Sequence, residues 1–105
     1  MTRVLFLFPR STESKPLDEF ITKTFVPGLR GASGARSVAV SAGELMSPGG
    51  PPPYSRVVEA SFESIADVVA AVEAPNAQVA RQQLRDLGTL ILMYEITEGP
   101  AAAVS

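Results

Sequence analysis

One carboxylate stands out for its place in the sequence, because Glu59 interrupts the short apolar segment 57–62. The side chains of this segment alternate in polarity, as in a strand with two distinct faces. Glu59 is the candidate catalytic residue, since burial among apolar groups favours a protonated carboxyl group and suits it to shuttle a proton. The alternative is a structural ion pair in which the carboxylate meets Arg10, Arg36 or Arg56, and such pairs are common.

The residue types that are missing narrow the chemistry further. The chain has no cysteine and no histidine. It therefore lacks a thiolate nucleophile, an imidazole base, the commonest transition-metal ligands and the usual proximal haem ligand. We expect no metal site and no cofactor. The glycines at positions 28, 31 and 34 do not form a phosphate-binding loop, because they neither follow a strand nor open a convincing helix.

Several other side chains are candidates for ligand binding. Tyr54 follows three prolines and could offer its phenol to a ligand, although such a tyrosine more often packs over a sheet edge. Arg36 and Ser61 are the polar candidates on the strands. The apolar candidates could line a ligand pocket or could pack in the core or at a subunit interface; they are Phe6, Phe8, Phe25 and Met93.

Length and composition predict one globular domain. The chain has 105 residues, of which 46% are hydrophobic and 19% charged. The net charge of −2 is spread without a basic stripe, which disfavours nucleic acid and anionic membranes as partners. The apolar run 4–8 is too short for a signal peptide or a membrane span, so we expect a cytoplasmic protein.

The apolar periodicity predicts four strands and two helical regions. Strands are expected over residues 4–8, 36–42, 57–62 and 89–96. The first strand is apolar at every position and is expected to be buried on both faces. A helix is predicted from residue 17, ended or bent at Pro27-Gly28. A second helix is capped by Ser64 with Asp67, carries an apolar stripe (residues 65, 68, 69 and 72), restarts at Pro75 and stops at Gly88. Residues 1–98 form the domain, and residues 99–105 are expected to be a flexible tail.

The order strand, helix, strand, strand, helix, strand is typical of the α+β ferredoxin-like fold with a four-stranded antiparallel sheet. In this fold both helices pack on one face of the sheet. The other face keeps the remaining apolar side chains of the first strand, and an apolar face of that kind predicts association. Two sheets that meet face to face would make a homodimer enclosing an α/β barrel, with Glu59 pointing into it.

With this arrangement, the sequence resembles the EthD-like family of the dimeric α/β-barrel superfamily. The resemblance spans about residues 3 to 97 and rests on the order of these segments: Phe8-Pro9-Arg10, Asp18-Glu19-Phe20, Pro52-Pro53-Tyr54, Glu59, Phe62-Glu63-Ser64-Ile65 and Ala74-Pro75. It implies a homodimer with a ligand in the barrel lumen. The chain departs from the family pattern at two positions: Phe25 replaces the usual histidine at the end of the first helix, and Ser61 replaces the usual aromatic residue two places after the strand glutamate. Val38 stands where the methylmuconolactone methylisomerases, which look like relatives, carry a tyrosine.

Two classes of function follow. The first is a cofactor-independent isomerase, cyclase or decarboxylase that acts on a small hydrophobic cyclic or aromatic metabolite with Glu59 as the proton shuttle. The second is a non-catalytic small-molecule-binding or accessory protein. The strand glutamate favours the first class, and the absence of histidine favours the second.

Overall fold

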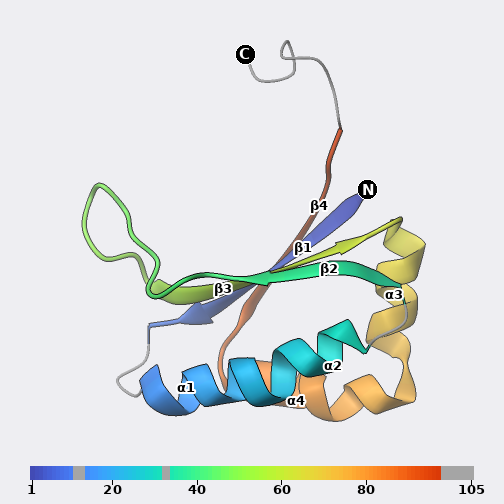
Figure 1. Cartoon of the computed structure of the whole chain (residues 1–105), viewed down its shortest axis with the longest axis horizontal. Coiled ribbons are helices and arrows are strands. Elements are labelled where there is room, and N and C mark those ends of the chain that lie inside the picture. The colour runs from blue at the N-terminus through green and yellow to red at the C-terminus, as the bar shows by residue number, and fades with distance from the viewer. Residues whose placement is uncertain (11–13, 32–33, 98–105) are drawn as a thin grey trace.

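The computed structural model describes residues 1–10, 14–31 and 34–97 (Figure 1). The strands are β1 (Thr2–Pro9), β2 (Ala35–Val40), β3 (Tyr54–Phe62) and β4 (Leu90–Glu95). The first helical region is α1 (Ser14–Phe20), a π-helical turn (Ile21–Phe25) and α2 (Val26–Arg30). The second is α3 (Ile65–Glu73), a 3-10 turn (Pro75–Ala77) and α4 (Gln78–Asp86). The predicted tail lies outside the described residues, as do residues 32 and 33 of the predicted loop 31–34.

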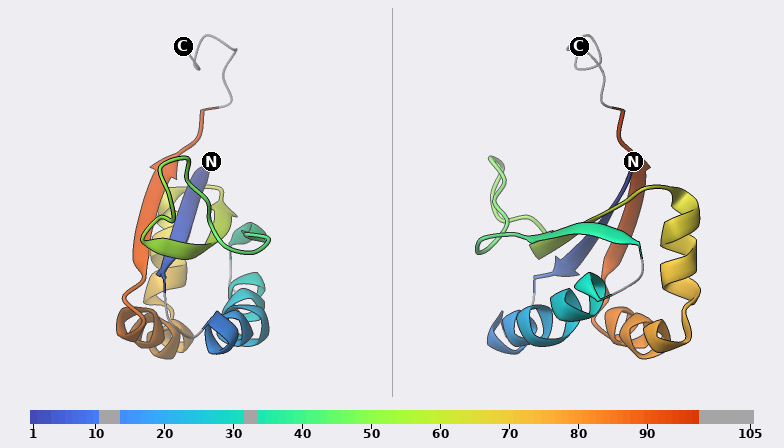
Figure 2. Two further views of the ribbon diagram at one scale, coloured as in Figure 1. Left: turned by 90° about the vertical axis from the view of Figure 1, so that its left-hand side faces the viewer. Right: turned by 45° about the vertical axis from the view of Figure 1, so that its right-hand side comes forward.

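The four strands form one antiparallel sheet in the order β2-β3-β1-β4. Two long strands, β1 and β3, lie in the middle, and the shorter β2 and β4 form the edges. Helices α1, α2 and α4 form a layer on one side of the sheet, and α3 runs from the end of β3 down to that layer (Figures 1 and 2). The element order and the strand order are those of the ferredoxin-like fold, so the predicted fold class is confirmed.

The hydrophobic core fills the space between the sheet and the helices. Alternate residues of β1 and β3 face it, and Phe8, Val58 and Ala60 are fully buried there. Phe25 lies at the centre, with its ring edge-on to Phe6 at 4.9 Å and to Phe8 at 5.8 Å between centroids. Such edge-to-face pairs add to the burial of the rings themselves.

The first strand is not buried on both faces within one chain. Its residues alternate between buried and half-buried, with Val4, Phe6 and Phe8 under the helices and Leu5 and Leu7 on the other face. The continuous apolar run predicted two covered faces, but both helical regions lie on the same side of the sheet. The second face therefore stays open in the single chain (Figure 2).

Pro27 does not end the first helical region, although it was expected to end or bend it. The helix widens instead into a π-helical turn, in which the Val26 amide donates to the Ile21 carbonyl five residues back. Pro27 then lies in the first turn of α2. The widened turn thus carries the chain past the proline, which is one of the few ways in which helices do so.

The second helical region begins and ends as predicted. The Ser64 hydroxyl accepts a hydrogen bond from the Asp67 amide at 3.3 Å and so caps α3. Ala74 leaves helical geometry before Pro75, and the chain restarts into α4. At the far end Gly88 has a φ of +72°, and the Thr89 and Gly88 amides bond back to the Leu84 and Arg85 carbonyls at 3.0 Å. This is a glycine-dependent C-terminal cap.

The predicted apolar stripe of the second helix is buried at only one of its four positions. Val68 is 4% exposed, whereas Ile65, Val69 and Val72 are 51%, 44% and 44% exposed. The reason is the position of α3, which contacts β3 and α4 and does not cover the edge strand β4. Ile91 and Met93 of β4 are exposed on that side for the same reason.

Candidate functional site on the open sheet face

The open face of the sheet carries every second residue of each strand, in rows that run across all four strands. Glu59 lies in the middle row, opposite Leu5 of β1 and Ala39 of β2. Leu92 of β4 extends the row on the far side of Leu5. The strand neighbours of Glu59, Val58 and Ala60, are fully buried under the helices. Glu59 therefore points away from the helices, as predicted.

One of the two adjacent rows is largely apolar. Leu7 lies opposite Val57 on one side and Leu90 on the other. Ser41 ends this row just after β2, where its amide donates to the Val57 carbonyl at 3.0 Å and its hydroxyl accepts from the Val57 amide at 3.2 Å. The apolar members of this row, together with Leu5 and Leu92, form an apolar surface beside Glu59; they are Leu7, Val57 and Leu90. Leu90 and Leu92 are 37% and 43% exposed.

The other adjacent row is polar. Arg3 lies opposite Ser61 of β3 and Tyr94 of β4, and Ser61 lies opposite Ser37 of β2. Ser61 is buried by its neighbours, while Tyr94 is 43% exposed. The sequence-based prediction included Ser61 but missed Arg3 and Tyr94. The alternation of Arg3, Leu5 and Leu7 in the first strand is the signal that could have found Arg3, and Tyr94 continues the parity of Leu90 and Leu92 in the last.

Glu59 is half-buried, and its side chain makes no ion pair or hydrogen bond with the residues that the structure describes. The three arginines that could have paired with it bind other carboxylates. Arg10 meets Glu44 at 3.3 Å, Arg56 meets Asp18 at 2.8 Å, and Arg36 pairs with Glu63. Within residues 1–10, 14–31 and 34–97, the structural ion pair that was the alternative for Glu59 is not formed. Its catalytic role stays a prediction.

The other predicted ligand-binding residues are not gathered around Glu59. Phe6, Phe8 and Phe25 lie in the core on the far side of the sheet, as in the packing alternative. Met93 lies opposite Val4, on the helix side of the edge strand, and is 55% exposed. These four side chains are therefore on the other face of the sheet from Glu59.

Two polar candidates lie at the ends of strands. Tyr54 is half-buried at the start of β3, opposite Pro9 at the end of β1. Arg36 is exposed on β2 and forms its ion pair with Glu63 just beyond β3. Neither side chain lies in the row of Glu59.

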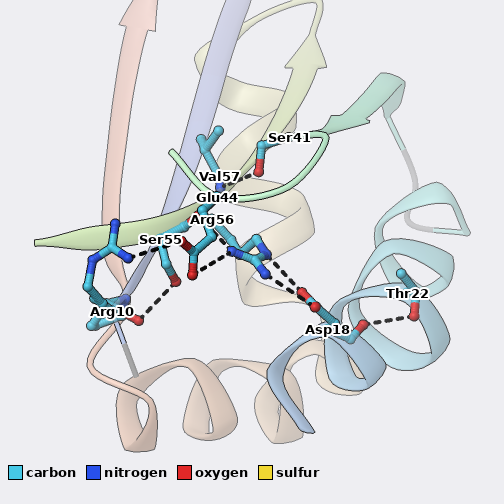
Figure 3. A network of polar contacts seen from close by, with 9 residues as sticks. Arg10, Asp18, Thr22, Ser41, Glu44, Ser55, Arg56 and Val57 are labelled. Carbon is cyan, nitrogen blue, oxygen red and sulfur yellow. Dashed lines mark hydrogen bonds and ion pairs between the residues drawn. The ribbon is translucent and has the colours of Figure 1, made fainter. Parts of the chain in front are cut away.

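A polar network around the buried Arg56 joins β3, α1 and the loop between β2 and β3 (Figure 3). Arg56 donates to both carboxylate oxygens of Asp18, at 2.8 and 3.3 Å, and to the Ser55 carbonyl at 3.1 Å. Glu44 lies between Arg56 and Arg10, 4.0 and 3.3 Å from them. The hydrogen bonds that Arg56 donates to Asp18 raise the pKa of Arg56, against the opposing effect of burial, and the charges of Asp18 and Glu44 add to the rise. All these groups are paired, so the network is structural.

A hollow lies on the helix side of the molecule, between α1 and α4. It has a volume of about 560 Å³ and is lined by Pro9, Pro16, Leu17, Phe20, Gln83, Asp86 and Leu87. Its one carboxylate, Asp86, accepts a hydrogen bond from Gln82 at 2.8 Å. The hollow is separated from Glu59 by the sheet and belongs to a different surface.

Two further properties concern metals and membranes. Among the residues that the structure describes, no three acidic side chains gather into a group that could hold a metal ion. None of the helices within residues 14–31 and 34–97 is both long and apolar enough to cross a membrane.

The sheet order and the helix layer define a ferredoxin-like α+β protein with one open sheet face, and solved structures share this fold. An EthD family protein from Bacillus halodurans matches with a TM-score of 0.79 and 17% identity, over 92% of this chain and 99% of that one. A hydroxynitrile lyase from Passiflora edulis matches with a TM-score of 0.73 and 17% identity, over 94% of each chain. A variant of SnoaB, a cofactor-independent oxygenase from Streptomyces nogalater, matches with a TM-score of 0.65 and 13% identity, over 93% of each chain.

These likenesses confirm, at the level of the fold, the resemblance to EthD-like proteins that the sequence indicates. No protein-family model matches the sequence, and no match was found among curated proteins.

Proposed function

We propose that this protein is a cofactor-independent enzyme, of the isomerase, cyclase or decarboxylase type, that acts on a small hydrophobic cyclic or aromatic metabolite. The observation that carries the proposal is the position of Glu59. It is the one carboxylate in the three rows of the open face, it lies between Leu5 and Ala39, and no described residue pairs with it. A carboxyl group in such surroundings is suited to take a proton from one atom of a substrate and return it to another.

The reaction site is proposed to form between two copies of the chain. The leucines of the open face support this, because a second sheet laid over them would bury them and exclude water from the same space. Exclusion of water favours the protonated form of a carboxyl group and strengthens its interaction with a bound substrate. Two of the solved structures that share the fold are named as a lyase and a cofactor-independent oxygenase, which shows that the fold can support catalysis in other proteins.

The test measures turnover of probe substrates by the wild type and by Glu59→Gln, which keeps the shape of the side chain and removes its acid–base chemistry. The probes are an unsaturated lactone, which an isomerase would rearrange, and an aromatic carboxylic acid, which a decarboxylase would convert, with products followed by chromatography. We expect turnover of at least one probe, with a pH–rate profile that shows the ionisation of one carboxyl group. Glu59→Gln should lower kcat by about a hundredfold or more and abolish that ionisation.

Glu63→Gln is the matched control, because Glu63 is an exposed carboxylate paired with Arg36 and lies off the open face. It should leave both the rate and the pH profile unchanged. A rate that is equal in Glu59→Gln and the wild type would contradict the proposal.

The second candidate function is a non-catalytic small-molecule-binding or accessory protein. The absence of histidine from the whole sequence favours it, because the commonest general base is missing. In that case the probes should bind to the wild type without turnover, and Glu59→Gln should bind them with similar affinity.

A further inference from the structure

The polar row of the open face places four hydrogen-bond donors next to one another. Tyr94, Arg3, Ser61 and Ser37 follow in this order across β4, β1, β3 and β2. Side chains that lie directly opposite on neighbouring strands have Cβ atoms about 4.5 to 5.5 Å apart. A single anionic group bound over this row could therefore contact the guanidinium of Arg3 and the hydroxyl of the exposed Tyr94 beside it.

Arg3 differs from the arginines at positions 10, 36 and 56 because its guanidinium meets no carboxylate among the residues that the structure describes. Arg10, Arg36 and Arg56 each meet a carboxylate. Arg3 makes no ion pair and no side-chain hydrogen bond with any residue in 1–10, 14–31 or 34–97. Glu59 lies diagonally across from it, one row along, and the two are not paired. If a second copy or a ligand covers the face, a guanidinium there needs an anionic partner, because burying an unpaired charge costs several kcal/mol in general.

The remainder of the face is complementary to an apolar ring. Leu5 and Leu92 flank the middle row, and Leu7, Leu90 and Val57 form the next row. The face thus has a cationic, donor-rich end and an apolar end, and Glu59 stands between the two. A ligand that matches both ends must itself have an anionic end and an apolar body.

We propose that the substrate is a small ring compound that bears an anionic group, such as a carboxylate. Arg3, with the hydroxyl of the exposed Tyr94 beside it, binds the anionic group, and the leucines hold the ring. This arrangement places the bonds next to the anionic group within reach of Glu59. The inference rests on the proposed function, because it takes the open face as the substrate site.

Two dyes that share one apolar body test the inference. Anilinonaphthalene sulfonate carries an anionic group, and N-phenylnaphthylamine has the same rings without it. Fluorescence titrations give a dissociation constant for each dye with the wild type, Arg3→Gln and the control Arg30→Gln, which changes an exposed arginine at the end of α2 on the helix side. We expect Arg3→Gln to weaken binding of the sulfonate dye about tenfold, as for the loss of a charged hydrogen bond, and the neutral dye less than about twofold.

Arg30→Gln should leave both dissociation constants unchanged. Arg3→Lys keeps the positive charge and should restore part of the lost affinity for the sulfonate dye. Such a recovery would show that the loss in Arg3→Gln is not a folding defect. Equal weakening of both dyes in Arg3→Gln, no weakening of either, or no binding of the sulfonate dye to the wild type would overturn the inference.

The outcome for Arg3 is separable from the outcome for Glu59. Turnover that depends on Glu59 but is the same in Arg3→Gln for acidic and neutral probes would overturn this inference and leave the proposed function standing. Binding of anions that depends on Arg3, without turnover of any probe, would support the inference and overturn the catalytic role.

Discussion

Arg56 and Asp18 form a two-point ion pair that fastens the central strand β3 to the first helix. The Nε and Nη2 atoms of Arg56 lie 2.8 and 3.3 Å from the two carboxylate oxygens of Asp18. The arginine is only 8% exposed, while the Asp18 side chain is 48% exposed. The pair therefore lies at the margin of the core, where a planar guanidinium matches a carboxylate in both geometry and charge.

The first prediction is that Asp18→Asn lowers the free energy of unfolding by about 1–2 kcal/mol. The change leaves a buried guanidinium without its main anionic partner, and the half-exposed position of Asp18 reduces the cost below that of a fully buried pair. Urea unfolding measures the difference. Glu63→Gln, which breaks the exposed pair with Arg36, is the control and should cost less than about 0.5 kcal/mol. Equal costs for the two variants would contradict the prediction.

The second prediction concerns how the contribution of this ion pair to the free energy of unfolding depends on pH, as set by the pKa of Arg56. The hydrogen bonds that Arg56 donates to Asp18 raise the pKa of Arg56 above the ordinary value of arginine. A cation whose pKa is higher in the folded protein than in the unfolded chain stabilises the fold. This stabilisation is complete at pH values below the pKa of the unfolded chain, and it is lost only as the pH rises through the higher pKa of the folded protein. The difference between the wild type and Asp18→Asn should thus stay constant from neutral to mildly alkaline pH. Denaturant titrations at several pH values check this, and a difference that shrinks over that range would contradict it.

The third prediction concerns the start of α3. Ser64→Ala should lower the free energy of unfolding by about 1 kcal/mol, because the Asp67 amide loses the hydroxyl that accepts its hydrogen bond. Ser64→Asp is the matched control, since a carboxylate at the same place can accept the bond and should preserve most of the stability. Thermal unfolding of both variants measures the effect. If the alanine and aspartate variants lost the same stability, the cap would not be the cause.

The sequence predicts the fold well because the signals that define it are local. The cap at Ser64, the break before Pro75 and the stop at Gly88 each depend on a few neighbouring residues, and the structure has all three. Of the two outcomes predicted for Pro27, an end or a bend, the helix does not end there because the preceding turn widens, and the widening is not visible in residue types. The exposed Ile65, Val69 and Val72 were misjudged because periodicity gives the apolar side of a helix but not what lies against it.

The candidate site was only partly predictable for a related reason. Alternation along a strand was enough to place Glu59 on the face opposite the helices. Phe62 lies three residues on and so on the other face of the strand, where it packs in the core. The residues beside Glu59 depend on strand order and register, which set Leu5 opposite it and Arg3 one row along. Phe6 and Phe8 were assigned to a possible pocket from residue type alone, and the alternation of β1 sends both into the core.

The last prediction tests whether the open face is an interface between two copies. We expect the wild type to be a homodimer at micromolar concentration, because Leu5, Leu7, Leu90 and Leu92 form an apolar surface that no described element of the chain covers. Leu92→Lys places a charge in the middle row of this surface and should give a folded monomer, since an unpaired charge in an interface is costly. Light scattering measures the mass, and circular dichroism checks that the variant is folded.

Val79→Lys is the matched control for this change. Val79 is 70% exposed on α4, on the other side of the molecule, so the same substitution there should leave the dimer intact. If the wild type were a stable monomer at micromolar concentration, the face would not be an interface, and Glu59 would lie open to water. A dimer that persists in Leu92→Lys but is lost in Val79→Lys would instead place the interface on the helix side. In both cases the enclosed site on which the catalytic proposal depends would be lost.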